Sequence, residues 1–172
     1  MDTIQIRSLR EVGDREMQEL SDVLIDCVEG GASVSFMLPI SRRTANGFWR
    51  NVAAGVAQGD RILVVAEDFA GQIVGTVQLI FAQAENQPHR ADIAKMLVHR
   101  RVRRRGVGAA LLAAAESAAL NAGKTLLVLD TASGDAERLY SRLGWQRSGV
   151  IPGYALLPGG GLCDTTFFYR TL

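Results

Sequence analysis

The chain has 172 residues, of which 48% are hydrophobic and 22% charged, with 19 lysines and arginines against 18 aspartates and glutamates. A chain of this length hides roughly 70% of the surface that it exposes when unfolded, so it can fold around an ordinary core. The near-neutral charge excludes a uniformly basic nucleic-acid-binding protein and a uniformly acidic one. Seventeen of the nineteen cations are arginine, however, and five of them fall within residues 100–105. That local cluster needs an explanation.

The N-terminus, the apolar runs and the cysteines point away from export, membranes and metals. Residues 1–17 are charged from the second position, so they lack the basic start and apolar stretch of a secretory signal. No run reaches the roughly 18 apolar residues that a membrane span needs. Cys27 and Cys163 stand far apart without a CxxC or histidine spacing, which argues against a zinc site or a disulfide framework. We therefore expect a cytoplasmic protein without a membrane or metal partner.

Two amphipathic helices are predicted in the first third of the chain, after a short strand near residues 4–10. Asp14 is a candidate cap for the first helix, in which apolar residues recur every three or four positions up to Val28. Ser41 is the corresponding cap of the second helix, which Gly59 should end. The segment between the helices contains glycines and a proline, so we expect it to form a loop.

The remainder of the chain alternates between predicted strands and helices. Residues 68–71 form a turn between the first two of these strands, so a hairpin is expected. A long helix follows residues 103–108 and should end at Gly123, and a shorter helix covers residues 135–143. Strands are predicted at residues 61–67, 73–81, 91–98, 125–130, from Trp145 onward and at 165–171.

Two segments of this second half have a distinct composition. Residues 125–130 are apolar up to their last position, which is typical of a strand buried on both faces. Residues 152–164 are rich in glycine and proline, and we expect a mobile loop that suits a lid. The predicted order is β-α-α-β-β-β-α-β-α-β-β, an α/β chain with antiparallel hairpins and a parallel crossover. Without repeats or a low-complexity linker, residues 1–172 should form one domain.

The arginine cluster leads directly into the long predicted helix. Residues 103–109 therefore present the free backbone N–H groups of a helix N-terminus, a site that suits phosphate oxygens. Gly106 and Gly108 have no side chain to keep a phosphate away from those groups. Arginines ahead of the turn add charge and paired donors, so the pattern fits a diphosphate. On spacing alone, an arginine-rich solvated loop fits equally well.

Other phosphate-binding classes fit this segment less well. The dinucleotide motif GxGxxG and the phosphate-loop motif GxxxxGK[ST] are both absent. Nucleic acid binding is disfavoured because no aromatic residues interleave with the arginines and the rest of the chain is not basic.

Two motifs resemble the signatures of one enzyme family. Arg103, Gly106 and Gly108 form R-x-x-G-x-G after a strand, which resembles the acyl-CoA signature of the GCN5-related N-acetyltransferase (GNAT) family. About 30 residues later, AERLYSRLGW at 136–145 is similar to the family's A-x-x-L-Y-x-x-x-G-F, with Trp145 replacing phenylalanine. The resemblance implies an α/β, single-domain GNAT-like fold over residues 1–172. Such a fold has a mixed, mostly antiparallel sheet of about six to seven strands, about four flanking helices and a splay between the central strands.

The same resemblance implies acetyl-CoA as co-substrate and indicates which residues bind it. The backbone of residues 96–98 would hold the pantetheine arm as an added strand does. Ser133 stands where the family often has an asparagine for that arm, and its shorter hydroxyl can bind directly or through water. The expected cofactor-binding residues are Met96, Leu97, Val98, Arg103, Arg104, Arg105, Gly106, Val107, Gly108, Ala109, Ser133 and Ala136.

Transfer of an acetyl group from sulfur to an amine needs an acid for the departing thiolate and a base for the amine. By resemblance Tyr140 is the acid, although a tyrosine on an amphipathic helix is otherwise a packing residue. Asp92, within a strand, and Asp130, at the end of the next strand, are equal candidates for the base. Either aspartate could instead bind the ammonium group of the substrate, and a strand-end aspartate often only caps a turn.

The acceptor site should draw on Ser33, Ser35 and Phe36, which precede the second helix, and on residues 152–161. Residues 32–41, the predicted helix at 42–49 and residues 152–161 resemble GNAT enzymes that inactivate a β-lactam amino acid of the tabtoxin type by acetylating it. The resemblance therefore implies an N-acetyltransferase acting on a small-molecule amine, with a role in antibiotic or toxin resistance. The alternative is a non-catalytic acyl-CoA-binding or regulatory module on the same fold. No nucleic acid partner is expected, and homodimerisation is left open.

Overall fold

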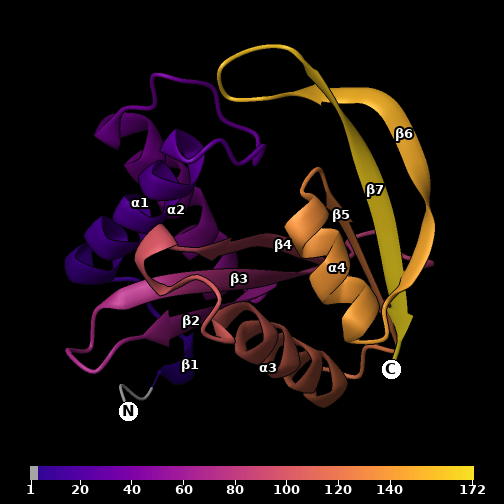
Figure 1. The fold of residues 1–172 in the computed structure, drawn as a ribbon. Coiled ribbons are helices and arrows are strands. Elements are labelled where there is room, and N and C mark those ends of the chain that lie inside the picture. Colours follow the sequence, from indigo (N-terminus) through magenta and orange to yellow (C-terminus); the bar gives the residue numbers. More distant parts are fainter. Residues whose placement is uncertain (1–3) are drawn as a thin grey trace.

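A computed structural model describes residues 4–172, which form seven strands, four α-helices and one short 3-10 helix, η1 (Arg100–Val102). The elements follow one another in the predicted order (Figure 1). The strands are β1 (Gln5–Leu9), β2 (Arg61–Glu67), β3 (Ile73–Phe81), β4 (Arg90–Val98), β5 (Leu126–Thr131), β6 (Gln146–Leu156) and β7 (Leu162–Thr171). The α-helices are α1 (Asp14–Glu29), α2 (Arg42–Gln58), α3 (Val107–Asn121) and α4 (Gly134–Arg142). None of these helices is both long and apolar enough to cross a membrane.

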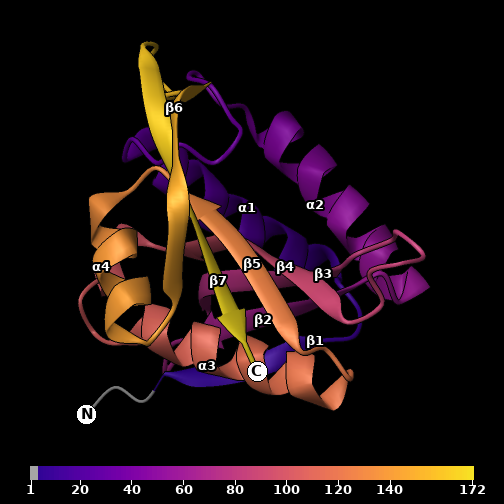
Figure 2. The same cartoon turned by 90° about the vertical axis from the view of Figure 1, so that its right-hand side faces the viewer.

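The seven strands form one sheet in the order β1-β2-β3-β4-β5-β7-β6. Neighbouring strands are antiparallel except β4 and β5, which are parallel and connected through α3. Figure 2 shows α1 and α2 on one side of the sheet and α3 and α4 on the other. The predicted α/β fold with a mixed, mostly antiparallel sheet is confirmed.

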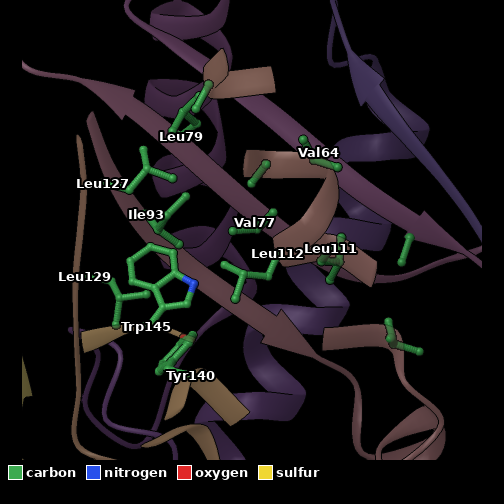
Figure 3. Close-up of a cluster of buried hydrophobic side chains, with 14 of the residues drawn as sticks. Val64, Val77, Leu79, Ile93, Leu111, Leu112, Leu127, Leu129, Tyr140 and Trp145 are labelled. Atoms are coloured by element: carbon green, nitrogen blue, oxygen red, sulfur yellow. The ribbon is translucent and has the colours of Figure 1, made fainter. Parts of the chain in front are cut away.

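Each face of the sheet has its own hydrophobic core. Beneath α1 and α2, Leu24 and Trp49 are fully buried. On the opposite face, Leu111 and Leu112 of α3 pack against strand residues such as Val77 (Figure 3). Full burial of one such aliphatic side chain contributes roughly 1.5–3 kcal/mol. The two cores hold the sheet from both sides and so fix where its strand ends lie.

Several local signals act as predicted. The Ser41 hydroxyl accepts a hydrogen bond from the Thr44 N–H at 3.0 Å and caps α2. Gly59 ends that helix with a φ of 78°, a left-handed conformation that glycine adopts readily. The expectation for Asp14 is wrong, because Gly13 is the N-cap and Asp14 is the first helical residue. Its carboxylate still lies at the positive end of the helix dipole.

The glycine- and proline-rich segment 152–164 is not the predicted loop. Its first five residues are the end of β6 and its last three are the start of β7, and only residues 157–161 between them form the turn of this hairpin. The register of the two strands jumps between Ile151 and Ala155, so Pro152 and Gly153 lie in a bulge, where a strand tolerates both residue types. Figure 1 shows this hairpin extending to the loop between α1 and α2.

The strands β4 and β5 pair over only three positions. Residues 90–92 are in register with residues 126–128, and the pairing stops there. Just beyond, β4 has a bulge: its register with β3 jumps between Ala94 and Leu97, and Lys95 has a φ of 48°. Because a bulge increases local twist, the end of β4 turns away from β5. This is the predicted splay between the central strands.

The splay also corrects the expectation that β5 is buried on both faces. Leu127 and Leu129 are buried in the core beneath α3, whereas Asp130 on the other face is exposed. The second face of β5 opens onto the space between the strands, so it has no covering layer there.

Candidate active site

A cavity of about 970 Å³ opens where β4 and β5 separate. Its walls are the loop between α1 and α2, the second half of β4, the first turn of α3, the end of β5, α4 and residues 154–157 of β6 and its turn. Ser33 Oγ donates to the Leu156 carbonyl at 3.0 Å, and the Leu38 N–H donates to the Pro158 carbonyl at 2.9 Å. The β6–β7 hairpin and the α1–α2 loop are therefore joined over the cavity.

The first turn of α3 forms one end of this cavity. Gly106 is its N-cap with a φ of 79°, and within residues 4–172 no side chain caps the turn. The N–H groups of residues 107–109 therefore keep their hydrogen-bonding capacity, and the helix dipole adds positive potential. Gly108 brings α3 close to α4, since a Cβ there would lie 3.2 Å from Leu139 Cδ2. A Cβ at Gly106 would meet nothing within 4 Å, so the N–H donors lie open, and they fit an anion such as a diphosphate.

Two arginines of the cluster are structural. Arg100 binds the Asp26 carboxylate through its backbone N–H at 2.8 Å and its Nε at 2.9 Å. Burial alone would raise the pKa of Asp26, but the hydrogen bonds from Arg100 outweigh burial and lower it. Arg101 pairs with Asp68 at 3.0 Å, in the turn between β2 and β3. These two side chains hold η1 against α1 and the β2–β3 turn, and neither lines the cavity.

The other three arginines differ in what they contact. Arg103 lines the cavity, but its Nε donates to the Val98 carbonyl at 3.0 Å and its guanidinium lies 3.8 Å from Cys27 Sγ. Arg104 lines the cavity as well, whereas Arg105 is exposed outside it. Of the predicted diphosphate-binding cations, Arg104 is thus the one whose side chain has no hydrogen-bond partner within residues 4–172 and faces the cavity.

Residues 96–98 lie on the part of β4 that pairs with β3 but not with β5, and they line the cavity. The Leu97 side chain is buried in the core beneath α1, so its backbone can bind a ligand while its side chain packs. Ser133 caps α4, because its Oγ accepts a hydrogen bond from the Ala136 N–H at 3.3 Å. One of the two lone pairs of its oxygen is therefore used, and its hydroxyl proton is left to donate.

Tyr140 of α4 places its hydroxyl at the cavity and its ring in the core. The ring lies beside Trp145 (Figure 3), with 5.9 Å between the two ring centroids, and its centroid is 5.7 Å from that of Phe168. The hydroxyl approaches Met96 Sδ at 4.0 Å, a weak acceptor. Burial, and to a smaller extent the charge of Asp130, raises the pKa of Tyr140. The phenol is therefore protonated at neutral pH and can donate a hydrogen bond.

The two candidate bases differ in position. Asp130 lines the cavity, and its pKa is raised by loss of solvent within the cleft and by the charge of Asp92, against the opposing effect of Lys95. Asp92 lies outside the lining residues and pairs with Arg90, Nη1 to Oδ1, at 2.6 Å. The geometry thus favours Asp130 for contact with a ligand.

The three residues expected at the acceptor site all line the cavity, but with different contacts. The hydrogen bond of Ser33 to Leu156 joins the α1–α2 loop to the β6–β7 hairpin, and these two segments together form the roof of the cavity. Ser35 has a φ of 78° and accepts a hydrogen bond from the ammonium of Lys95 at 3.0 Å. Phe36 packs edge to face on Phe48, with 5.3 Å between ring centroids.

Sequence reasoning assigned no role to several residues of the cavity wall, among them Lys95 and Thr165, and it included Tyr154 only as part of the segment 152–161. Lys95 had a signal, because it is the single charged residue in the otherwise apolar run between Asp92 and Val98. Tyr154 lay in the segment interpreted as a loop, where no side-chain direction can be predicted. Within residues 4–172, no group of three or more histidine, cysteine or acidic side chains is placed to hold a metal ion.

Solved structures with the same fold are numerous. One is a proposed acetyltransferase from Acinetobacter baylyi, with 17% identity, 100% of this chain and 93% of that chain covered, and a TM-score of 0.84. Another is a Salmonella typhimurium protein solved with its cofactor acetyl-CoA (18% identity, 98% and 94% covered, TM-score 0.79). A third is a proposed phosphinothricin N-acetyltransferase (19% identity, 99% of each chain covered, TM-score 0.80).

Residues 58–147 match the family model of the acetyltransferase (GNAT) domain, which is more than half of the chain. The chain belongs to the GNAT acetyltransferase family. The match begins at the end of α2 and runs through the first turn of α3 and through α4, so it includes both motifs on which the resemblance was based.

Proposed function

We propose that residues 1–172 form one acetyltransferase domain that transfers an acetyl group directly from acetyl-CoA to the amine of a small molecule. The observation that carries this proposal is the shared cavity of three features: the uncapped first turn of α3, the buried hydroxyl of Tyr140 and the carboxylate of Asp130. Each suits one requirement of the reaction, namely an anion site, a proton donor and a proton acceptor.

The co-substrate supplies the acetyl group as a thioester. An amine can attack the carbonyl carbon of a thioester directly, so the acetyl group needs no further activation. The N–H groups of residues 107–109 and the guanidinium of Arg104 would hold its diphosphate. The open edge of residues 96–98 would hold its pantetheine arm, with the Ser133 hydroxyl as a further donor and Ala136 beside it. The fit rests on the uncapped helix and on the glycines that leave it accessible.

In the reaction the amine nitrogen bonds to the acetyl carbon, the carbon–sulfur bond breaks, and the sulfur leaves with its electron pair. Asp130 takes the proton that the attacking amine gives up, directly or through water. Tyr140 donates its proton to the sulfur, and it recovers one from solvent. The products are an amide and a thiol, and the ammonium's extra proton is released. Asp92, the other candidate for the base, pairs with Arg90 outside the cavity lining, and its charge helps to raise the pKa of Asp130.

The acceptor in this proposal is a small amine, and an antimicrobial β-lactam amino acid of the tabtoxin type is our specific candidate. The roof that joins the α1–α2 loop to the β6–β7 hairpin favours a compact molecule over a protein side chain. The segments 32–49 and 152–161 also resemble the tabtoxin-resistance acetyltransferase. The proposal includes a cytoplasmic role in resistance to such a compound.

The test is thiol release from acetyl-CoA with a panel of amines that includes β-lactam amino acids, simple amino acids and polyamines. Mass spectrometry of the product should show a mass increase of one acetyl group on nitrogen. Binding of acetyl-CoA is measured separately by calorimetry. Tight acetyl-CoA binding without turnover on any amine would refute the proposed acetyltransferase activity and favour an acyl-CoA-binding module. Absence of acetyl-CoA binding would refute both hypotheses.

A further inference from the structure

Lys95 is a cation of the cavity wall to which the proposed reaction gives no role, and it lies beside the residues expected at the acceptor site. It sits at the bulge of β4, in a left-handed conformation, and lines the cavity. Its ammonium donates to Ser35 Oγ at 3.0 Å and lies 5.9 Å from the centroid of the Phe48 ring. These contacts position the ammonium beside the residues expected to bind the acceptor.

The charge of Lys95 is not neutralised by an ion pair. Within residues 4–172 none of the salt bridges involves it, although the carboxylate of Asp130 acts on it electrostatically. Burial lowers the pKa of Lys95, and Asp130 opposes that effect. A partly buried ammonium without an anion in direct contact is unfavourable, so a ligand that brings an anion to it is bound more strongly than in water.

The position of Lys95 also matters for the kind of acceptor. Leu127 and Leu129 of β5 are buried beneath α3, so Asp130 lies on the opposite face of β5, the face of α1 and α2. Lys95 contacts Ser35 and the Phe48 ring of α2 on that same side. The ammonium of Lys95 and the carboxylate of Asp130 therefore line the same part of the cavity, on the side of α1 and α2. A lysine in this part of the cavity repels the ammonium of a simple amine, but it attracts a molecule that also carries a carboxylate.

We propose that Lys95 binds the carboxylate of the acceptor, so that the enzyme selects amino acids over amines that lack an acid group. This inference rests on the proposed N-acetyltransferase function and names its substrate class. Asp130 binds the amine end of the same molecule, and Ser35 holds the Lys95 side chain in the orientation that reaches the carboxylate.

The test compares amino acids with their decarboxylated counterparts, such as tyrosine with tyramine and leucine with isoamylamine. The chain offers a matched control, because its only other lysine, Lys124, also lies over an aromatic ring, 4.6 Å from the Phe81 centroid. Lys124 donates to the Pro88 carbonyl at 2.7 Å and lies outside the cavity. Both lysines are changed to methionine, and Lys95 also to arginine.

The wild-type protein should have the higher kcat/KM with the amino acid of each pair. In Lys95→Met the ratio of the two kcat/KM values should fall by roughly 10- to 100-fold, mainly through KM, as expected for a lost charged hydrogen bond. Lys95→Arg should restore part of the ratio, and Lys124→Met should leave it as in the wild type. Using the ratio cancels a general loss of activity or of folded protein.

Two results would overturn the inference while the proposed function stands: a wild type without preference for the amino acid, or an equal loss for both substrates in Lys95→Met. Failure of every amine to react would refute the proposed function instead. In that case thermal unfolding with added amino acid tests the role of Lys95, because it measures binding and needs no reaction. The amino acid should raise the Tm of the wild type more than that of Lys95→Met. Equal shifts, or none, would overturn the assignment of Lys95.

Discussion

Changing Tyr140 to phenylalanine removes one hydroxyl from a side chain whose ring the core holds in place. The contacts of the ring with Trp145 and Phe168, at 5.9 and 5.7 Å between centroids, are available to phenylalanine as well. The polar contact that is lost is the approach of the hydroxyl to Met96 Sδ at 4.0 Å, which is longer than a normal hydrogen bond to oxygen. We therefore expect the free energy of unfolding to change by less than about 1 kcal/mol.

The effect on catalysis should be much larger. Loss of a general acid typically slows a reaction by about 10²- to 10⁴-fold, which corresponds to about 3–5 kcal/mol in the activation barrier. The affinity for acetyl-CoA should stay close to that of the wild type, because the first turn of α3 and the edge of β4 provide its binding contacts. The variant thus separates the chemical step from folding and from binding.

The assay measures kcat from thiol release at saturating substrate concentrations, across the neutral to alkaline range. Calorimetry gives the acetyl-CoA Kd, and thermal unfolding gives the Tm. Tyr169→Phe is the matched control, because its hydroxyl bonds to Gln146 Oε1 at 2.5 Å outside the cavity, and kcat should be retained. A Tyr140→Phe variant with a kcat within about twofold of the wild type would refute the acid role, since even a weak general acid contributes more. A fall in kcat that parallels a fall in Tm would assign Tyr140 to packing.

Three further changes test the surroundings of the site. Asp130→Asn should abolish most turnover. Because the pKa of Asp130 is raised, its protonated form stabilises the fold below the unfolded pKa of about 3.9, and that contribution is lost as pH rises. The Tm of Asp130→Asn should therefore exceed that of the wild type at neutral pH but not at low pH, and equal Tm values throughout would contradict the raised pKa. Asp26→Asn weakens the hydrogen bonds that Arg100 donates to residue 26, so the free energy of unfolding at neutral pH should fall by about 1–3 kcal/mol. Since the pKa of Asp26 is lowered, the difference should shrink as pH falls through that pKa, and a loss independent of pH would argue against an ionised Asp26. Gly106→Ala places a Cβ on a residue with φ of 79°, which costs roughly 1–2 kcal/mol and should weaken acetyl-CoA binding, and an unchanged Kd would show that this turn does not hold the diphosphate.

Much of the fold was predictable because its signals are local. Ser41 and Gly59 mark the two ends of α2 through contacts within a few residues. The turn at 68–71 is closed by local hydrogen bonds from the N–H groups of Ala70 and Gln72 to the Asp68 carboxylate. The segment 152–164 was misassigned for the converse reason. Its glycines and proline are tolerated in a bulge, and pairing with a partner strand decides whether such a segment is a loop or a strand.

The site was predictable in part. The motif around Gly106 and Gly108 is a run of neighbouring residues, so its chemistry can be interpreted directly: a helix begins there and its N–H groups are free. The choice between Asp92 and Asp130 could not be made from sequence. It depends on where β4 and β5 stop pairing, and that point is set by the bulge at Lys95.

The sequence by itself determined that this is a near-neutral α/β chain whose arginine cluster precedes an open helix N-terminus. Only the tertiary structure decided what each arginine does. Arg100 and Arg101 pair with Asp26 and Asp68, which lie far away in the sequence, and Arg104 is left facing the cavity. An ion pair requires two side chains within a few ångströms, and the packing of α1, β2 and β3 against η1 supplies that proximity. Position in the chain shows which charges are near each other in sequence, whereas folding determines which of them remain available to a ligand.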